Sequence, residues 1–187
     1  MKALVGGELL YHGSYVLVEQ PLLEKCAPRK DFGHGFYLTT SLEQARSFAA
    51  LSLRKARNSG TVGNDVASGF VSRFRYAPDG RKPLNLHSFE TADAEWLHCV
   101  VAHRKERMFA DVFAAMAMYD VISGKIANDQ TNATIVAYMG GIFGTPGDAS
   151  ADEACIRLLI PERLHDQHCF RTERALAALK FEGGECV

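Results

Sequence analysis

Two short stretches near the start of the chain, LYHGS (10–14) and DFGHGFYLTT (31–40), decide the fold that we expect. The first predicts a strand that ends in Gly-Ser, so His12 stands at a strand end, before a glycine whose backbone a ligand can approach closely. The second predicts a strand directly after Gly-x-Gly. Its aromatic pair, Phe36 and Tyr37, therefore stands where a strand meets a cleft.

A helix is expected over 42–57, because Ser41 begins the Ser-x-x-Gln pattern of a capping box. Phe48 of this helix lies eleven positions after Tyr37. Two aromatic rings that face each other across a strand-to-helix turn can hold a flat heterocycle by stacking. A lone histidine or phenylalanine is more often a structural residue, but the conjunction of all these residues favours a ligand site.

The rest of the chain predicts short strands and helices in no regular βαβ order, which favours an α+β fold over a doubly wound sheet. The stretch FVSRFRY (70–76) alternates, which puts Phe70, Phe74 and Tyr76 on one face and Arg73 and Arg75 on the other. Further strands are expected over 84–89, 117–123 and 167–171, and helices over 91–108, 129–139, 152–159 and 172–179. No repeat or linker divides the chain, so we expect one domain over 1–187.

Composition limits the function. The 187 residues carry 21 Lys and Arg against 22 Asp and Glu, a formal charge of −1, which excludes an obviously polybasic binder of nucleic acid or membranes. Five widely spaced cysteines without Cys-x-x-Cys favour reduced thiols in a cytoplasmic protein. We expect no signal peptide and no membrane-spanning helix. No metal site is expected, because Cys99 and His103, at helical spacing, have no second pair, and Cys99 is better explained as a core residue.

These motifs resemble two known families. His-Gly-Ser, then Gly-x-Gly-Phe-Tyr, then a helix with an aromatic residue, resemble the NAD-binding half of ADP-ribosyltransferases of the His-Tyr-Glu type, such as diphtheria toxin and the poly-ADP-ribose polymerases. Together with YDVI (119–122), IAND (126–129) and DQHCFRT (166–172), they more closely resemble a bacterial family catalogued as domain of unknown function 3990. This resemblance extends from Leu9 to Phe181.

The resemblance implies an ADP-ribosyltransferase-like split antiparallel β-sandwich with surrounding helices, built around a cleft for NAD as co-substrate. It implies NAD binding by His12, Gly13, Ser14, Phe36, Tyr37 and Phe48, and catalysis by His12, Tyr37 and Gln167. By resemblance, His12 would hydrogen-bond the adenosine ribose, and the Gly13 backbone would hold the nicotinamide amide. Tyr37 would stack on the nicotinamide ring, with Phe48 as the second aromatic residue.

Gln167 departs from the family pattern, which has a glutamate at the start of a late strand. Glutamate binds the ribose hydroxyl and stabilises the oxocarbenium-like charge that develops as nicotinamide leaves, whereas glutamine keeps only the hydrogen bond. We therefore expect slower transfer, transfer of a single unit, or dependence on a base supplied elsewhere. The adjacent Asp166 is a poor substitute, because neighbouring side chains of a strand point to opposite faces.

We predict mono-ADP-ribosyl transfer from NAD to a macromolecular acceptor, a protein or a nucleic acid. By analogy, the chain would be a toxin-like bacterial effector in the cytoplasm that does not associate with membranes. A neutralising partner protein would control it. Two alternatives stay open. In one, the missing carboxylate leaves a catalytically inactive module that binds NAD or another nucleotide. In the other, nucleic acid is the acceptor and contacts Arg73 and Arg75.

Overall fold

Helices and strands alternate irregularly along the chain. The computed structural model describes residues 3–105, 107–126, 129–160 and 164–187, so residues 127–128 of the IAND block lie outside the described residues. Its strands are β1 (Leu9–Ser14), β2 (Phe36–Leu38), β3 (Phe70–Tyr76), β4 (Leu86–Ser88), β5 (Val121–Lys125), β6 (Asp166–Phe170) and β7 (Leu179–Cys186). Its helices are α1 (Leu42–Asn58), α2 (Ala94–Arg104), α3 (Ala110–Met116), α4 (Asp129–Met139), α5 (Ala149–Leu159) and α6 (Glu173–Leu176), with a 3₁₀ turn η1 (Leu23–Lys25).

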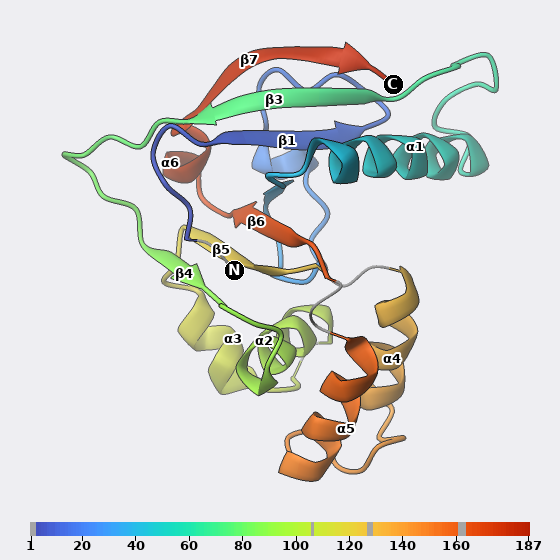
Figure 1. Cartoon of the computed structure of the whole chain (residues 1–187), viewed down its shortest axis with the longest axis vertical. Coiled ribbons are helices and arrows are strands. Elements are labelled where there is room, and N and C mark those ends of the chain that lie inside the picture. Colours follow the sequence, from blue (N-terminus) through green and yellow to red (C-terminus); the bar gives the residue numbers. More distant parts are fainter. Residues whose placement is uncertain (1–2, 106, 127–128, 161–163) are drawn as a thin grey trace.

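The strands form two sheets, which confirms the α+β class. The first sheet has the order β1-β3-β7 and is antiparallel, and the second has the order β2-β6-β5-β4. The expectation of two antiparallel sheets is wrong for one pair, because β4 runs parallel to β5. The chain passes from β4 to β5 through α2 and α3, and such a long crossover returns it in the same direction. Figure 1 shows the first sheet at one end of the molecule, the second sheet in the middle and α2 to α5 at the other end.

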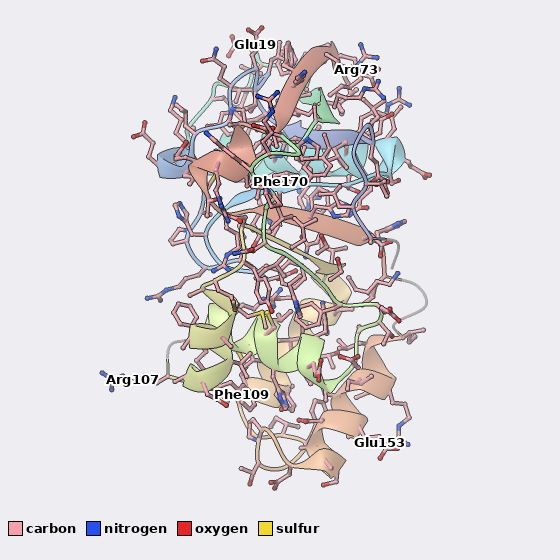
Figure 2. The ribbon with its side chains drawn as sticks, turned by 90° about the vertical axis from the view of Figure 1, so that its left-hand side faces the viewer. Glu19, Arg73, Arg107, Phe109, Glu153 and Phe170 are labelled. Atoms are coloured by element: carbon pink, nitrogen blue, oxygen red, sulfur yellow. The ribbon has the colours of Figure 1, made fainter. Side chains whose placement is uncertain are left out.

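Two apolar layers hold the sheets in place. The layer between the sheets contains Leu10, Phe74 and Phe170, all fully buried, and Figure 2 shows Phe170 in the middle of the molecule. The layer between the second sheet and the helices contains Trp96 of α2 and Tyr138 of α4. Because an aromatic side chain removes about 150–250 Å² from water on burial, these rings contribute a large share of the stability. The second sheet is therefore covered on both faces.

The start of α1 is fixed by a hydrogen-bonded N-cap. Ser41 Oγ accepts from the Gln44 N–H at 3.2 Å, and the helix begins at Leu42, as the sequence predicts. The reciprocal half of the capping box takes a different form. Thr39 Oγ1, rather than Gln44, accepts from the Ser41 N–H at 3.1 Å, and it donates to Gln44 Oε1 at 2.8 Å. The cap thereby ties α1 to the end of β2.

We expect Ser41→Ala to lower the free energy of unfolding by about 1 kcal/mol, because the Gln44 N–H then loses its acceptor. Ser41→Gly is the matched control and should cost only about a few tenths of a kcal/mol, since glycine is itself a favourable N-cap. Urea denaturation followed by circular dichroism measures both. Equal midpoints for Ser41→Ala and the wild type would contradict the cap.

Besides the short turn η1, helix α3 and strand β7 were not predicted from the sequence. Helix α3 has no buried residue, so it lacks the strongly apolar face by which a helix is recognised. Strand β7 alternates between half-buried and exposed residues, but glycines at two of its eight positions hide the pattern. At Gly183, where φ is +111°, the register with β3 shifts. A glycine at this bulge avoids the strain that a side chain would suffer.

Several predicted boundaries were wrong, some of them by more than two residues at one end. The helix expected over 172–179 ends at Leu176, because Leu179 already starts β7. The strand expected over 117–123 begins only at Val121. The helix expected over 91–108 spans Ala94–Arg104, because Asp93 caps it through the Trp96 N–H at 3.0 Å.

Candidate functional site

The strands of the two N-terminal motifs meet once and then part. Tyr11 of β1 and Thr39 after β2 exchange backbone hydrogen bonds of 2.8 and 3.0 Å. In a continuous antiparallel ladder, the next bonded pair would be Gly13 and Tyr37. Instead β1 continues with β3 and β2 continues with β6, so the two sheets diverge there. We call the open position of the ladder between Gly13 and Tyr37 the strand split.

His12 stabilises the strand split. Its Nδ1–H donates to the Tyr37 carbonyl oxygen at 2.8 Å, the acceptor that Gly13 would use in a continuous ladder. Its ring lies against Phe36, with ring centroids 4.4 Å apart. Burial lowers the pKa of His12, and the bond to Tyr37 opposes this only in part, so the imidazole is neutral at pH 7. Because Nδ1 carries the proton, Nε2 is an acceptor that can bind a hydroxyl group.

Gly13 turns its peptide groups toward the strand split. Backbone groups of a strand alternate in direction, and Tyr11 bonds to Thr39, so the N–H and C=O of Gly13 point the same way, away from β3. Position 13 has no room for a side chain, because a Cβ on Gly13 would lie 1.9 Å from the Ala45 carbonyl oxygen of α1. The glycine thus serves two purposes. It lets α1 pack against β1, and its peptide groups border the strand split.

Tyr37 is held by the loop that precedes β2. Its hydroxyl accepts from the Phe32 N–H at 2.9 Å and donates to the Gly33 carbonyl oxygen at 2.8 Å. Burial raises the pKa of Tyr37 well above its usual value, so the hydroxyl stays protonated and keeps both bonds. The half-buried ring is therefore fixed in position, while the N–H of Tyr37, like that of Thr39, points toward β1.

Helix α1 brings two more side chains beside the strand split. Gln44 is 6% exposed, and its Nε2 has no hydrogen-bond partner among the described residues. Phe48 follows one helical turn later on the same side of α1. A Cβ on Gly13 would also lie 2.7 Å from the Ala49 N, so this turn of α1 runs directly alongside the split. Phe48 is half-buried, and no ring contact involves it in the part of the chain that the structure describes.

Gln167 lies on the same face of the second sheet as Tyr37. Tyr37 pairs with Cys169, and side chains two residues apart on a strand share a face, so Tyr37, Cys169 and Gln167 point the same way. Strand β2 lies between β6 and the strand split, so Gln167 is one strand removed from the split. His12 and Phe36 point to the opposite face, and only the His12 imidazole reaches the split.

A buried polar network holds Gln167. Its Nε2 donates to Asp31 Oδ2 at 2.9 Å and to the Lys125 carbonyl oxygen at 3.4 Å. Asp31 is 7% exposed, and its Oδ1 accepts from Arg104 Nε at 3.0 Å. Arg104 in turn donates to Asn132 Oδ1 at 2.8 Å. The loop before β2 therefore anchors Gln167 through Asp31, and it anchors Tyr37 through Phe32 and Gly33.

One of the predicted binding residues lies in the core. Phe36 is 5% exposed and belongs to the layer between the sheets, where its ring packs edge-on against Phe74. Ser14 ends β1 opposite Phe70. The structure thus groups Gly13, Tyr37, Phe48 and Gln167 on one side of the strands and gives Phe36 a core position behind them.

The basic pair on β3 is only partly available. Arg75 Nε and Nη2 donate to the two carboxylate oxygens of Glu182 at 2.8 and 2.7 Å, and Nη1 donates to the Gly7 carbonyl oxygen at 3.0 Å. Figure 2 shows Arg73 at the outer end of the molecule. Glu182 of the neighbouring strand β7 therefore offsets the positive charge of Arg75, which reduces the charge that β3 offers to a nucleic acid.

Other kinds of site find little support in the described ranges. No group of three or more His, Cys, Asp or Glu side chains is arranged there to hold a metal ion. All five cysteines are free, and Cys99 is fully buried, as predicted. No helix in the same ranges has both the length and the apolar character needed to cross a membrane.

Sequence reasoning missed three residues of this region: Asp31, Arg104 and Gln44. Asp31 and Arg104 are 73 positions apart, and Asp31 and Gln167 are 136 apart, so no local pattern announces their contacts. Gln44 had a signal, since it stands in the capping pattern, but its amide contacts a threonine side chain instead of the helix end.

Comparison with known families completes the description. Residues 9–181 match a family described as "Protein of unknown function (DUF3990)". No curated protein and no solved structure gives a significant match. The matched range includes the strand split, the loop before β2 and Gln167.

Proposed function

The chain belongs to the DUF3990 family, and we propose that it is an NAD-dependent mono-ADP-ribosyltransferase. The strand split is the observation that carries this proposal. One backbone acceptor and two backbone donors border it, a neutral imidazole stabilises it, and an aromatic residue flanks it. Each of these groups matches a part of NAD.

The backbone of the strand split fits a carboxamide. A primary amide offers one carbonyl acceptor and two N–H donors, which is the complement of a strand edge. In the proposed complex, the Gly13 carbonyl oxygen accepts from the nicotinamide amide, and the N–H groups of Gly13 and Tyr37 donate to its oxygen. The pyridine ring then stacks on Phe48, on the side of β1 that α1 covers.

The remaining polar groups fit the riboses. His12 Nε2, an acceptor in the neutral imidazole, binds a hydroxyl of the adenosine ribose. Gln167 lies on the same face as Tyr37, on the strand next to β2, and binds a hydroxyl of the nicotinamide ribose. Both assignments need the donor and acceptor types that these side chains possess.

The reaction follows from this arrangement. The glycosidic bond between ribose C1′ and the nicotinamide nitrogen breaks, and nicotinamide leaves with the electron pair. An acceptor nucleophile bonds to C1′ and gives its proton to a base or to water. Without a carboxylate at position 167, less of the oxocarbenium-like charge is stabilised, which supports transfer of a single unit at a modest rate.

Isothermal titration tests the carboxamide site. We expect NAD and nicotinamide to bind, and nicotinic acid to bind about tenfold more weakly or worse, because its carboxylate has no N–H for the Gly13 carbonyl oxygen. Equal affinities for the two pyridines would contradict the assignment. Labelled NAD with a cell lysate then identifies the acceptor, since the label enters either protein or nucleic acid. If NAD is neither bound nor consumed, the proposal fails.

Phe48→Leu tests the stacking partner. We expect NAD to bind about fivefold more weakly, because an aromatic stack contributes about 0.5–1.5 kcal/mol beyond area burial. Phe113→Leu on α3 is the matched control, since Phe113 is 51% exposed and far from α1 in the fold. It should leave the affinity unchanged. A similar loss in both variants would remove Phe48 from the site.

A catalytically inactive NAD-binding module is the second candidate. The observation that favours it is the side chain of Gln167, which carries no negative charge and is held by a neighbouring carboxylate. The two candidates differ in one measurement. A transferase releases nicotinamide from NAD in the presence of lysate, whereas the module binds NAD without releasing it.

A further inference from the structure

The amide of Gln167 is held in one orientation. Both hydrogens of Nε2 are used, one by Asp31 Oδ2 at 2.9 Å and one by the Lys125 carbonyl oxygen at 3.4 Å. A rotation that exchanged Nε2 and Oε1 would bring Oε1 against two acceptors, which is unfavourable. The carbonyl oxygen Oε1 is therefore the group that Gln167 presents on its other side.

Asp31 is kept in place by a cation. Arg104 donates to Oδ1 through Nε at 3.0 Å and Nη2 at 2.5 Å, and the guanidinium is itself anchored on Asn132. The side chains of Asp31 and Arg104 are 10% and 14% exposed, so the pair is largely shielded from water. A charge-assisted hydrogen bond from an amide to such a carboxylate is stronger than one between neutral groups.

We propose that Asp31 is the positioning residue for catalysis, and that Asp31 and Gln167 together replace the single glutamate of the His-Tyr-Glu pattern. Asp31 draws on the Gln167 N–H and polarises the amide, so that Oε1 is a stronger and correctly directed acceptor for the ribose hydroxyl. The negative charge of the site then resides on the loop before β2, one hydrogen bond away from the Gln167 amide. This inference rests on the proposed transferase function.

The arrangement also explains why glutamate would be unsuitable at position 167. Its carboxylate would stand where the amide now lies, 2.9 Å from Asp31 Oδ2, and two carboxylates at that distance cannot both stay ionised without a large penalty. Gln167→Glu is therefore expected to lower transfer, although it restores the residue of the resembling family. Restoring activity requires Asp31→Asn as well, because the asparagine amide can donate to the new carboxylate.

The experiment compares the wild type with Asp31→Asn, Gln167→Glu and the double variant. We measure nicotinamide release at saturating NAD, the KM for NAD and the melting temperature. Each single variant should release nicotinamide about tenfold more slowly or worse, with a KM within about threefold of the wild type. The double variant should recover part of the rate, because a hydrogen bond again joins residues 31 and 167 with its polarity reversed, although the Lys125 carbonyl oxygen stays without its donor.

Each alternative outcome has a definite meaning. An unchanged rate in Asp31→Asn overturns the inference, and so does a double variant as slow as the slower single one. Melting temperatures that fall and recover while the rates stay equal would assign the pair a purely structural role. If the wild type binds NAD but releases no nicotinamide, the transferase proposal fails together with the inference, and the inactive NAD-binding module remains. If the wild type does not bind NAD, that module fails too.

Discussion

Gly13→Ala is expected to lower the free energy of unfolding by about 3 kcal/mol, because a Cβ at this position meets main chain on α1. The Cβ would lie 1.9 Å from the Ala45 carbonyl oxygen and 2.7 Å from the Ala49 N. Neither atom belongs to a side chain that could rotate away. Helix α1 must therefore shift from β1, and the cluster of Ala45, Ala49 and Val71 loses contact with it.

The same change should remove NAD binding, since Phe48 moves with the helix and the strand split changes its width. Gly80→Ala is the matched control, because a Cβ there has no neighbour within 4 Å. Urea denaturation gives the stability of both variants, and titration with NAD gives their affinity. A Gly13→Ala protein that unfolds at the same urea concentration as Gly80→Ala would show that α1 does not pack this closely against β1.

The glycine shows how far the sequence could predict this site. The order His-Gly-Ser indicates that a strand ends beside a ligand, and the structure places His12 and Gly13 at the point where β1 and β2 part. The sequence could not indicate that the Cβ direction is closed by α1, because that contact joins segments more than thirty residues apart. Local patterns predict which backbone is special, whereas packing decides what occupies the space around it.

The fold was predicted best where local signals agree. Capping by Ser41 and alternation over Phe70–Tyr76 gave α1 and β3 nearly to the residue. Prediction failed where tertiary contacts override local preference. Strand β7 exists because β3 offers it a partner along seven residues, and its own glycines would not have indicated a strand. Likewise, the parallel pair of β4 and β5 follows from a crossover whose helix α3 has no sharp apolar pattern.

The sequence indicates the strands that border the candidate site, but not the charged residues that contact Gln167. Position 167 carries a neutral amide, which suggested a weakened enzyme as long as the side chain was considered alone. The structure supplies a carboxylate from the loop before β2 and a guanidinium from the end of α2. The charge beside Gln167 therefore depends on a contact between residues 136 positions apart, which no local sequence pattern contains.

The second large effect concerns Asp120, which joins β4, β5 and α6. Its side chain is 4% exposed, and all its partners are donors. Oδ2 accepts from the Asn85 N–H at 2.7 Å, and Oδ1 accepts from Thr172 Oγ1 at 2.8 Å and from Arg174 Nε at 2.6 Å. Burial alone would raise the pKa of Asp120, but these hydrogen bonds, led by that of Arg174, outweigh burial and lower it.

Asp120→Asn should therefore lower the free energy of unfolding at pH 7 by about 2–3 kcal/mol, because its amide nitrogen would turn a donor toward donors. The value stays moderate because the Arg174 side chain is 53% exposed and can return to water. The folded pKa lies below the unfolded one. The stabilisation by the carboxylate is thus fully present above the unfolded value of about 3.8 and is lost as the pH falls through the folded pKa. Urea denaturation from pH 7 down to pH 3 should show the difference between wild type and variant beginning to narrow below about pH 3.8.

Asp65→Asn is the control. It lies at an exposed loop position and should change the unfolding free energy by less than about 0.5 kcal/mol. A difference between wild type and Asp120→Asn that stays constant with pH would mean that the lost stability comes from shape and packing, not from the charge of Asp120.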